Sequence, residues 1–142
     1  MEESHVWNER LQLGDDDLDR EHHLQIALVT GLTEALERGR PLVARRIVEQ
    51  LSGYTKAHFA GEELLMELAG YRHLEAHRQE HQAILAHIEE IRYLHHQGEY
   101  DLAVPMAVDL LSGLASHIAA SDRRFAEASG RVPPIGATAT GS

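Results

Sequence analysis

The stretch His58-Phe59-Ala60-Gly61-Glu62-Glu63, with His77 and His81 further along, decides the fold of this chain. Residues three or four apart lie on the same face of a helix, so His58 and Glu62 share one face and His77 and His81 share another. One such pair is common on exposed helix surfaces. Two pairs on neighbouring helices instead indicate a metal site that the helices enclose.

The composition limits what the chain can bind. Its 142 residues carry 13 Lys and Arg against 23 Asp and Glu, a formal net charge of −10. This charge repels phosphate backbones and anionic lipid surfaces, so we expect neither nucleic acid nor a membrane as partner. Cysteine is absent, which excludes thiolate metal sites, iron–sulfur clusters and disulfides. Any metal must therefore be bound by nitrogen and oxygen.

The start of the chain, Met1-Glu2-Glu3-Ser4, lacks the basic and apolar regions of a signal peptide. No stretch reads as apolar and long enough to cross a bilayer. We therefore expect a cytoplasmic protein. Eleven histidines are many for this length, and they are spread along the chain, which excludes a purification tag.

Apolar residues recur at helical spacing over four long segments, and no alternating strand pattern competes with them. The predicted helices cover residues 18–38, 41–69, 72–97 and 102–128. Short segments that contain glycine or proline separate them. Four long amphipathic helices with short connections predict an all-α, antiparallel up-down-up-down four-helix bundle.

The ends of the elements also carry signals. Asp15, Asp16 and Asp17 are expected to cap the first helix, and Asp101 is expected to cap the last. The apolar stripes predict several core residues that include Leu24, Val43, Leu65 and Leu68. Residues 1–16 read as an extended arm anchored by Trp7, and residues 131–142 as a disordered tail, so the bundle domain covers residues 1–130.

All four predicted helices offer metal ligands at one level. In an antiparallel bundle the starts of the first and third helices lie beside the ends of the second and fourth, and the candidates lie roughly 6 to 17 Å from that end. These candidates are His22, His58, Glu62, His77, His81, His117 and Asp122. Five imidazoles and two carboxylates exceed the needs of one ion, but suit two adjacent ions with bridging carboxylates and one open position. Iron fits this ligand set, and manganese, zinc or copper remain open.

His117 and Asp122 are five residues apart, which turns them roughly 140° from each other on a regular α-helix. Two explanations remain open. Asp122 points between the ions while His117 reaches one of them, or the helix widens locally by a π-type turn.

In order, spacing and residue type, these residues resemble the hemerythrin family, specifically its bacterial single-domain members. The resemblance covers residues 5–126. The matching positions are Trp7, Gly14, Asp19-Arg20-Glu21-His22, His58-Phe59-Ala60-Gly61-Glu62-Glu63, Met66, Gly70-Tyr71, His77, His81, His117-Ile118 and Asp122.

The resemblance implies that His77, His81 and His117 hold one iron ion and that His22 and His58 hold the other. Two iron ions, cycling between Fe2+ and Fe3+, would share Glu62, Asp122 and an oxo or hydroxo bridge. Dioxygen would bind reversibly at the two-histidine iron and be held there as a hydroperoxide. The implied role is oxygen storage, delivery (oxygen transport) or sensing, and a sensor would need a separate protein partner.

The chain departs from the family at Gly113, four residues before His117, where members usually carry tryptophan. Unless Leu114 fills the space, this change predicts a wider and wetter pocket with faster autoxidation. It also favours an alternative function, a di-iron enzyme that reduces peroxide or nitric oxide. A third reading is a metal-free interaction bundle, which so many polar groups facing a core would destabilise.

We expect other roles for the histidine, glutamate and aromatic residues outside the seven ligand candidates. His23 and His73 are alternative ligands that lie off the common face or level. We expect His5, His87, His95 and His96 outside the site, and packing roles for Tyr54, Phe59, Met66 and Leu114. Glu63 is expected either to support a ligand or to face solvent. Tyr71 either packs at a helix end or lends its hydroxyl to the pocket rim.

Overall fold

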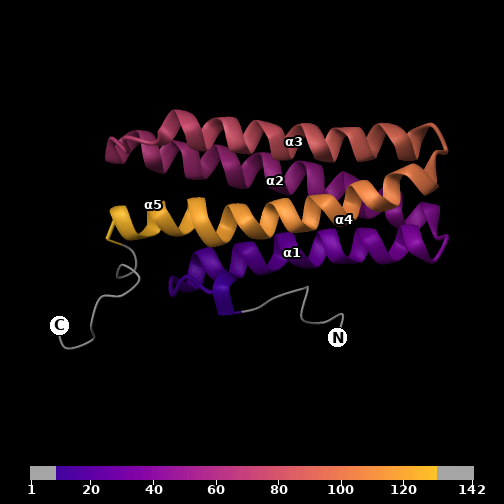
Figure 1. Cartoon of the computed structure of the whole chain (residues 1–142), viewed down its shortest axis with the longest axis horizontal. Coiled ribbons are helices and arrows are strands. Elements are labelled where there is room, and N and C mark those ends of the chain that lie inside the picture. The colour runs from indigo at the N-terminus through magenta and orange to yellow at the C-terminus, as the bar shows by residue number, and fades with distance from the viewer. Residues whose placement is uncertain (1–8, 131–142) are drawn as a thin grey trace.

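The computed structural model describes residues 9–130 and confirms the predicted all-α four-helix bundle within them. The helices form four rods, which lie side by side and alternate in direction (Figure 1). The elements are η2 (Glu9–Leu11), α1 (Asp16–Glu37), α2 (Pro41–Ala69), α3 (Leu74–His96), α4 (Tyr100–Ser116), η3 (His117–Asp122) and α5 (Arg123–Ala128). The fourth rod is α4 continued by η3 and α5. The bounds of α2 match the prediction, and those of the other rods differ by one or two residues.

The helix ends follow the local chemistry of the sequence in most places. Asp15 caps α1 as predicted, because its Oδ1 accepts hydrogen bonds from the amides of Asp17 and Leu18, both at 3.1 Å. Gly70 ends α2 in the left-handed conformation, with φ of 66°, which glycine adopts without strain. The prediction for Asp101 is wrong. Glu99 precedes α4 without a side-chain cap, and Asp101 lies inside the first turn.

The arm before α1 is not simply extended as predicted, because residues Glu9–Leu11 form the short 3-10 turn η2 and α1 already begins at Asp16. Its Leu11 and Leu13 are buried. Asp19 fixes the arm by accepting hydrogen bonds from the amides of Leu13 at 2.8 Å and Gly14 at 3.0 Å. The predictions for His5, Trp7 and the tail 131–142 lie outside the described residues.

The apolar core fills the middle of the bundle, and the prediction of its members was wrong at four positions. Leu24, Val43, Leu65 and Leu68 are exposed, Leu68 by 76%. Near its start, the buried face of α1 carries the polar residues Asp19, His22 and Gln25 among apolar residues. A pattern that counts only apolar residues therefore places Leu24 wrongly in the core.

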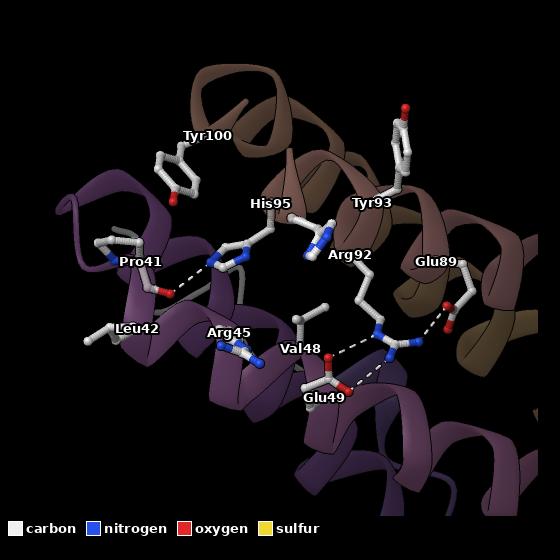
Figure 2. Close-up of a pocket in the computed structure, with 11 residues that line it drawn as sticks. Pro41, Leu42, Arg45, Val48, Glu49, Glu89, Arg92, Tyr93, His95 and Tyr100 are labelled. Atoms are coloured by element: carbon white, nitrogen blue, oxygen red, sulfur yellow. Dashed lines mark hydrogen bonds and ion pairs between the residues drawn. The ribbon is translucent and has the colours of Figure 1, made fainter. Parts of the chain in front are cut away.

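The end of the bundle opposite the buried histidines is joined by polar contacts between α2 and α3 (Figure 2). Arg92 on α3 binds Glu49 on α2 through both carboxylate oxygens, at 3.0 and 3.2 Å, and also binds Glu89 at 2.7 Å. His95 donates from Nε2 to the carbonyl oxygen of Pro41 at 2.7 Å. His95 therefore has a structural role far from the buried histidines.

One expectation about membrane segments was wrong. The continuous helix Tyr100–Ala128 has 29 residues and contains an 18-residue window with mean hydropathy of 1.5, so it is long and apolar enough to cross a membrane by length and composition. Core helices of bundles pass the same test. In this structure the helix packs against α1 and α3 and carries His117 and Asp122 on its buried side.

Candidate metal centre

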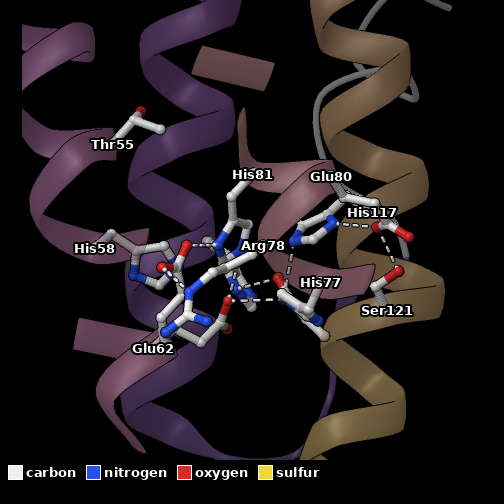
Figure 3. A network of polar contacts seen from close by, with 12 residues as sticks. Thr55, His58, Glu62, His77, Arg78, Glu80, His81, His117 and Ser121 are labelled. Carbon is white, nitrogen blue, oxygen red and sulfur yellow. Dashed lines mark hydrogen bonds and ion pairs between the residues drawn. The ribbon is translucent and has the colours of Figure 1, made fainter. Parts of the chain in front are cut away.

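The bundle brings all seven predicted ligand side chains together near one end, each 9% exposed or less. They form two groups that share a residue, and within each group the potential ligand atoms lie within 4.8 Å of one another. The larger group is Glu62, His77, His81, His117 and Asp122, and the smaller is His22, His58 and Glu62. All four rods contribute, and Figure 3 shows most of these side chains pointing toward one another.

Asp122 connects the two groups through its two oxygens. Its Oδ1 lies 3.0 Å from Nε2 of His77 and 3.1 Å from Nε2 of His117. Its Oδ2 lies 3.0 Å from Nε2 of His22, which belongs to the other group. The carboxylate therefore faces a different set of histidines with each oxygen.

Glu62 is the residue that both groups contain. Its Oε1 lies 3.1 Å from Nε2 of His77 and 3.0 Å from Nε2 of His81. Glu62 follows His58 by one turn of α2, as the sequence predicts. The two carboxylates thus lie between imidazoles from four different rods.

A local change of helix type brings His117 and Asp122 together. Residues His117–Asp122 form the π-helical segment η3, in which residues five apart follow one another along the same face. The second of the two explanations left open by the sequence is therefore confirmed. Without this wider turn the five-residue spacing would direct the two side chains apart.

Three of the histidines form hydrogen bonds, through the ring nitrogen that faces away from the centre, with carboxylates of an adjacent helix. In each case the imidazole donates from Nδ1 to a glutamate oxygen: His58 to Glu21 at 2.6 Å, His81 to Glu63 at 2.7 Å and His117 to Glu80 at 2.7 Å. A proton fixed on Nδ1 leaves the lone pair of Nε2 directed to the centre. The arrangement therefore prepares these imidazoles to bind a metal through Nε2.

Glu21 and Glu80 were missed by the sequence reasoning, whereas the supporting role considered for Glu63 matches its contact with His81. The sequence offers only a partial signal, a glutamate directly before a ligand histidine. Glu21 precedes His22, and Glu80 precedes His81. Each lies beside a ligand of its own helix and bonds to a ligand of the next helix, which only helix packing could reveal. Ser121 also donates to Glu80, at 2.6 Å.

The centre contains buried nitrogen atoms whose hydrogen bonding is incomplete. The Nε2 atoms of His22, His58, His81 and His117 are buried and form no hydrogen bond of acceptable geometry within residues 9–130, although carboxylate oxygens lie 3.0–3.1 Å from three of them. Buried polar atoms in proteins are nearly always bonded. Cations placed between these nitrogens and the two carboxylates would satisfy them together. The residues present therefore fit a metal site of nitrogen and oxygen ligands.

The histidines and carboxylates of the centre shift one another's pKa values. Burial lowers the pKa of His77, but the carboxylates of Asp122 and Glu62 outweigh this effect and raise it to about 9. Burial raises the pKa of Asp122, but the histidines around it lower that pKa well below its ordinary value. A metal ion would compete with the proton for the same nitrogen of His77.

The remaining candidates lie outside the two groups. His23, His73 and His96 are exposed. Phe59 stacks on the ring of His81 with centroids 3.7 Å apart, which supports its predicted packing role. Tyr71 packs against Phe125 with ring centroids 5.1 Å apart, in agreement with the packing alternative.

Position 113, where the resemblance leads us to expect tryptophan, lies on an exposed part of α4. A Cβ added to Gly113 would have no atom within 4 Å, so there is open space beside this glycine. Leu114 is buried in the apolar core. The predicted effect of Gly113 on the pocket stays a prediction.

The model of the hemerythrin HHE cation binding domain matches residues 13–128 of the chain. The chain belongs to the hemerythrin family. It is 30% identical to a bacteriohemerythrin of Stenotrophomonas maltophilia over 122 residues, which cover 86% of this chain and 79% of that protein. It is 31% identical to a bacteriohemerythrin of Ralstonia nicotianae over 117 residues, 82% of each chain.

A more distant bacteriohemerythrin, from Clostridium acetobutylicum, is 24% identical over 132 residues, which cover 84% of this chain and 97% of that protein. No solved structure gave a significant match. The hemerythrin family binds non-haem iron and takes dioxygen as a ligand, and the histidine and carboxylate cluster of this chain fits such a metal site.

Proposed function

We propose that this protein holds two iron ions and binds dioxygen reversibly. The observation that carries the proposal is the position of Asp122, whose Oδ1 faces His77 and His117 while its Oδ2 faces His22. A carboxylate with its oxygens turned to two sets of imidazoles suits a pair of ions, because a single ion needs only one of these sets. Membership of the hemerythrin family supports iron as the metal.

In this proposal the ligands divide unequally. His77, His81 and His117 hold one ion, His22 and His58 hold the other, and Glu62 and Asp122 are shared. The smaller group has one imidazole fewer, so its ion has the open coordination position for a small ligand. The division is supported by the two groups of ligand atoms, which have Glu62 in common.

The iron pair, when bound, would supply the electrons and the open position that dioxygen needs. The protein contributes orientation and shielding. Glu21, Glu63 and Glu80 keep a proton on Nδ1 of their histidine partners, which directs Nε2 inward. The near-complete burial of the cluster limits the access of water, which slows loss of the reduced state.

The ligand composition favours binding over oxidation chemistry. Di-iron bundles built for oxidation use carboxylate-rich sites with a Glu-x-x-His motif on each of two helices. Here five imidazoles accompany two carboxylates, and no such motif lies at the ligand positions. We therefore propose storage, delivery or sensing of dioxygen. A sensing role would need a separate partner protein.

The test is metal content combined with a visible spectrum. Full-length protein reconstituted with ferrous iron under nitrogen should hold two iron ions per chain. It should gain an absorption band on exposure to oxygen and lose it on evacuation, over repeated cycles. One ion per chain, or no iron at all, would contradict the proposal.

A second candidate function is reduction of peroxide or nitric oxide at the same ions. The observation that favours it is Gly113, one turn before His117, where no atom lies within 4 Å of the Cβ position. Open space there would admit water and further ligands. Steady consumption of peroxide by the iron-loaded protein, with no reversible oxygen spectrum, would favour this function over the first.

A further inference from the structure

A buried polar pair lies one helical turn from His22 and His58. Gln25 on α1 is 1% exposed and Thr55 on α2 is fully buried. Gln25 follows His22 by three residues and Thr55 precedes His58 by three, a distance of about 4.5 Å along each helix. Because α1 and α2 are antiparallel, both residues lie on the same side of the two histidines.

This side is opposite to the shared carboxylates. Glu62 follows His58 on α2, whereas Thr55 precedes it, and Figure 3 shows Thr55 and Glu62 on opposite sides of His58. The proposed ion of His22 and His58 would therefore have carboxylate oxygens on one side and the Gln25–Thr55 pair toward the other. The Gln25–Thr55 pair therefore lies on the side of this ion that has the fewest proposed metal ligands.

The hydrogen bonding of the pair is incomplete. The side-chain amide of Gln25 donates from Nε2 to Oγ1 of Thr55 over 3.4 Å, a long contact. The Oε1 of Gln25 is buried and has no partner. On the same helix the neighbouring core positions are the fully buried apolar residues Ile26 and Val29. A polar amide in this core therefore lacks the partners that usually accompany burial.

A free donor remains whichever way the amide is oriented. In the orientation described, one amide N–H reaches Thr55 and the second has no partner among residues 9–130. If the amide is turned over, the hydroxyl of Thr55 donates to its oxygen and both amide N–H groups are unpaired. Gln25 thus presents at least one unpaired N–H inside the protein, close to His22 and His58.

We propose that Gln25, positioned by Thr55, donates a hydrogen bond to a small ligand at the proposed iron of His22 and His58. The inference rests on the proposed function and names the class of ligand, a molecule with an O–O bond such as dioxygen or peroxide. The oxygen atom far from the metal carries the lone pairs that accept this bond. The bond holds the ligand and slows its release.

The experiment uses near-isosteric variants of the full-length protein. Gln25→Met and Thr55→Val remove the donors and conserve side-chain volume. After reconstitution with iron, the rate of dioxygen release is measured by stopped-flow mixing with an oxygen scavenger. We expect about a tenfold faster release in the double variant, equivalent to about 1.4 kcal/mol. Iron content should stay at two ions per chain. Gln82→Met, a change of an exposed glutamine on α3, is the control and should keep the parent rate.

A second readout does not depend on metal. Without metal, the double variant should unfold at a higher urea concentration than the parent, because it lacks the unpaired buried amide. If the double variant does not fold, the single variant Gln25→Met decides by the same two measurements. Thr55→Ser, which keeps the hydroxyl, should release dioxygen at the parent rate.

The outcomes separate the inference from the proposed function. A parent chain with two iron ions and reversible oxygen binding, together with an unchanged release rate in the double variant, overturns the inference alone. A loss of iron from Gln25→Met also overturns it, because Gln25 would then be a metal ligand. A parent chain that takes up no iron overturns both.

Discussion

His117 and Asp122 are five residues apart in sequence, yet Nε2 of His117 lies 3.1 Å from Oδ1 of Asp122. The π-helical segment His117–Asp122 makes this contact, because its wider turn places both side chains on the buried face of one rod. A regular α-helix would direct one of them away from the centre. The proposed iron site therefore depends on a local departure from α-helical geometry.

Deletion of Ala120, an exposed residue of this segment, should abolish the site. The remaining residues would form a regular turn and Asp122 would rotate by about 100°. We expect fewer than two iron ions per chain, measured by elemental analysis after reconstitution. Ala120→Ser keeps the length of the segment and should keep two ions.

Asp122→Asn, which preserves the shape of the side chain, should also lose iron. Full iron content in both the deletion and Asp122→Asn would refute the bridging role.

Glu80→Gln should weaken iron binding without removing a ligand. Glu80 accepts the Nδ1 proton of His117 at 2.7 Å, and a neutral amide accepts this bond less strongly. Loss of such a supporting contact typically lowers metal affinity 10–100-fold. The rate of iron removal by a chelator measures the effect. Glu90→Gln, an exposed change on the same helix, is the matched control. Equal rates in the two variants would show that Glu80 does not support the site.

The metal-free protein should lose stability as the pH rises from about 6.5 through about 9. Burial lowers the pKa of His77, but Asp122 and Glu62 raise it from 6.5 to about 9. A raised pKa in the folded state means that the proton stabilises the fold. The contribution is complete below pH 6.5 and is lost as the pH passes 9. Urea midpoints of the chelator-treated protein should fall over this interval.

The variant His77→Gln should show a smaller fall, because it lacks the group with the raised pKa. The iron-loaded protein should not show the fall, because iron replaces the proton on His77. A metal-free midpoint that stays level or increases from pH 6.5 to 9 would contradict the assignment.

Gly113→Trp should slow autoxidation of the oxygenated protein. Position 113 is exposed and a Cβ there has no atom within 4 Å, so a side chain can start there without a clash at its first atom. The ring would cover the approach to His117 and limit water. The decay of the oxygenated spectrum in air measures the effect. Gly113→Ala raises the helix propensity by about 1 kcal/mol but adds no indole. The oxygenated spectrum of this control should decay at the parent rate. Identical decay in all three proteins would show that Gly113 does not control the pocket.

The sequence by itself determined the number of helices, the bounds of α2 and the seven residues that gather at the centre. The reason is local. A period of 3.6 residues predicts which side chains share a face, and glycine and proline predict where a helix ends. An antiparallel bundle then aligns the candidates by simple counting along each axis.

Only the tertiary structure decided how the centre is held. The hydrogen bonds that His58 donates to Glu21 and His117 donates to Glu80 join different helices, so no spacing along one helix predicts them. The exposure of Leu24 and the burial of Gln25 have the same cause. Packing against neighbouring helices selects the buried face of α1, and near the centre that face is polar. The π turn likewise depends on the packed bundle, which keeps His117 and Asp122 on one buried face.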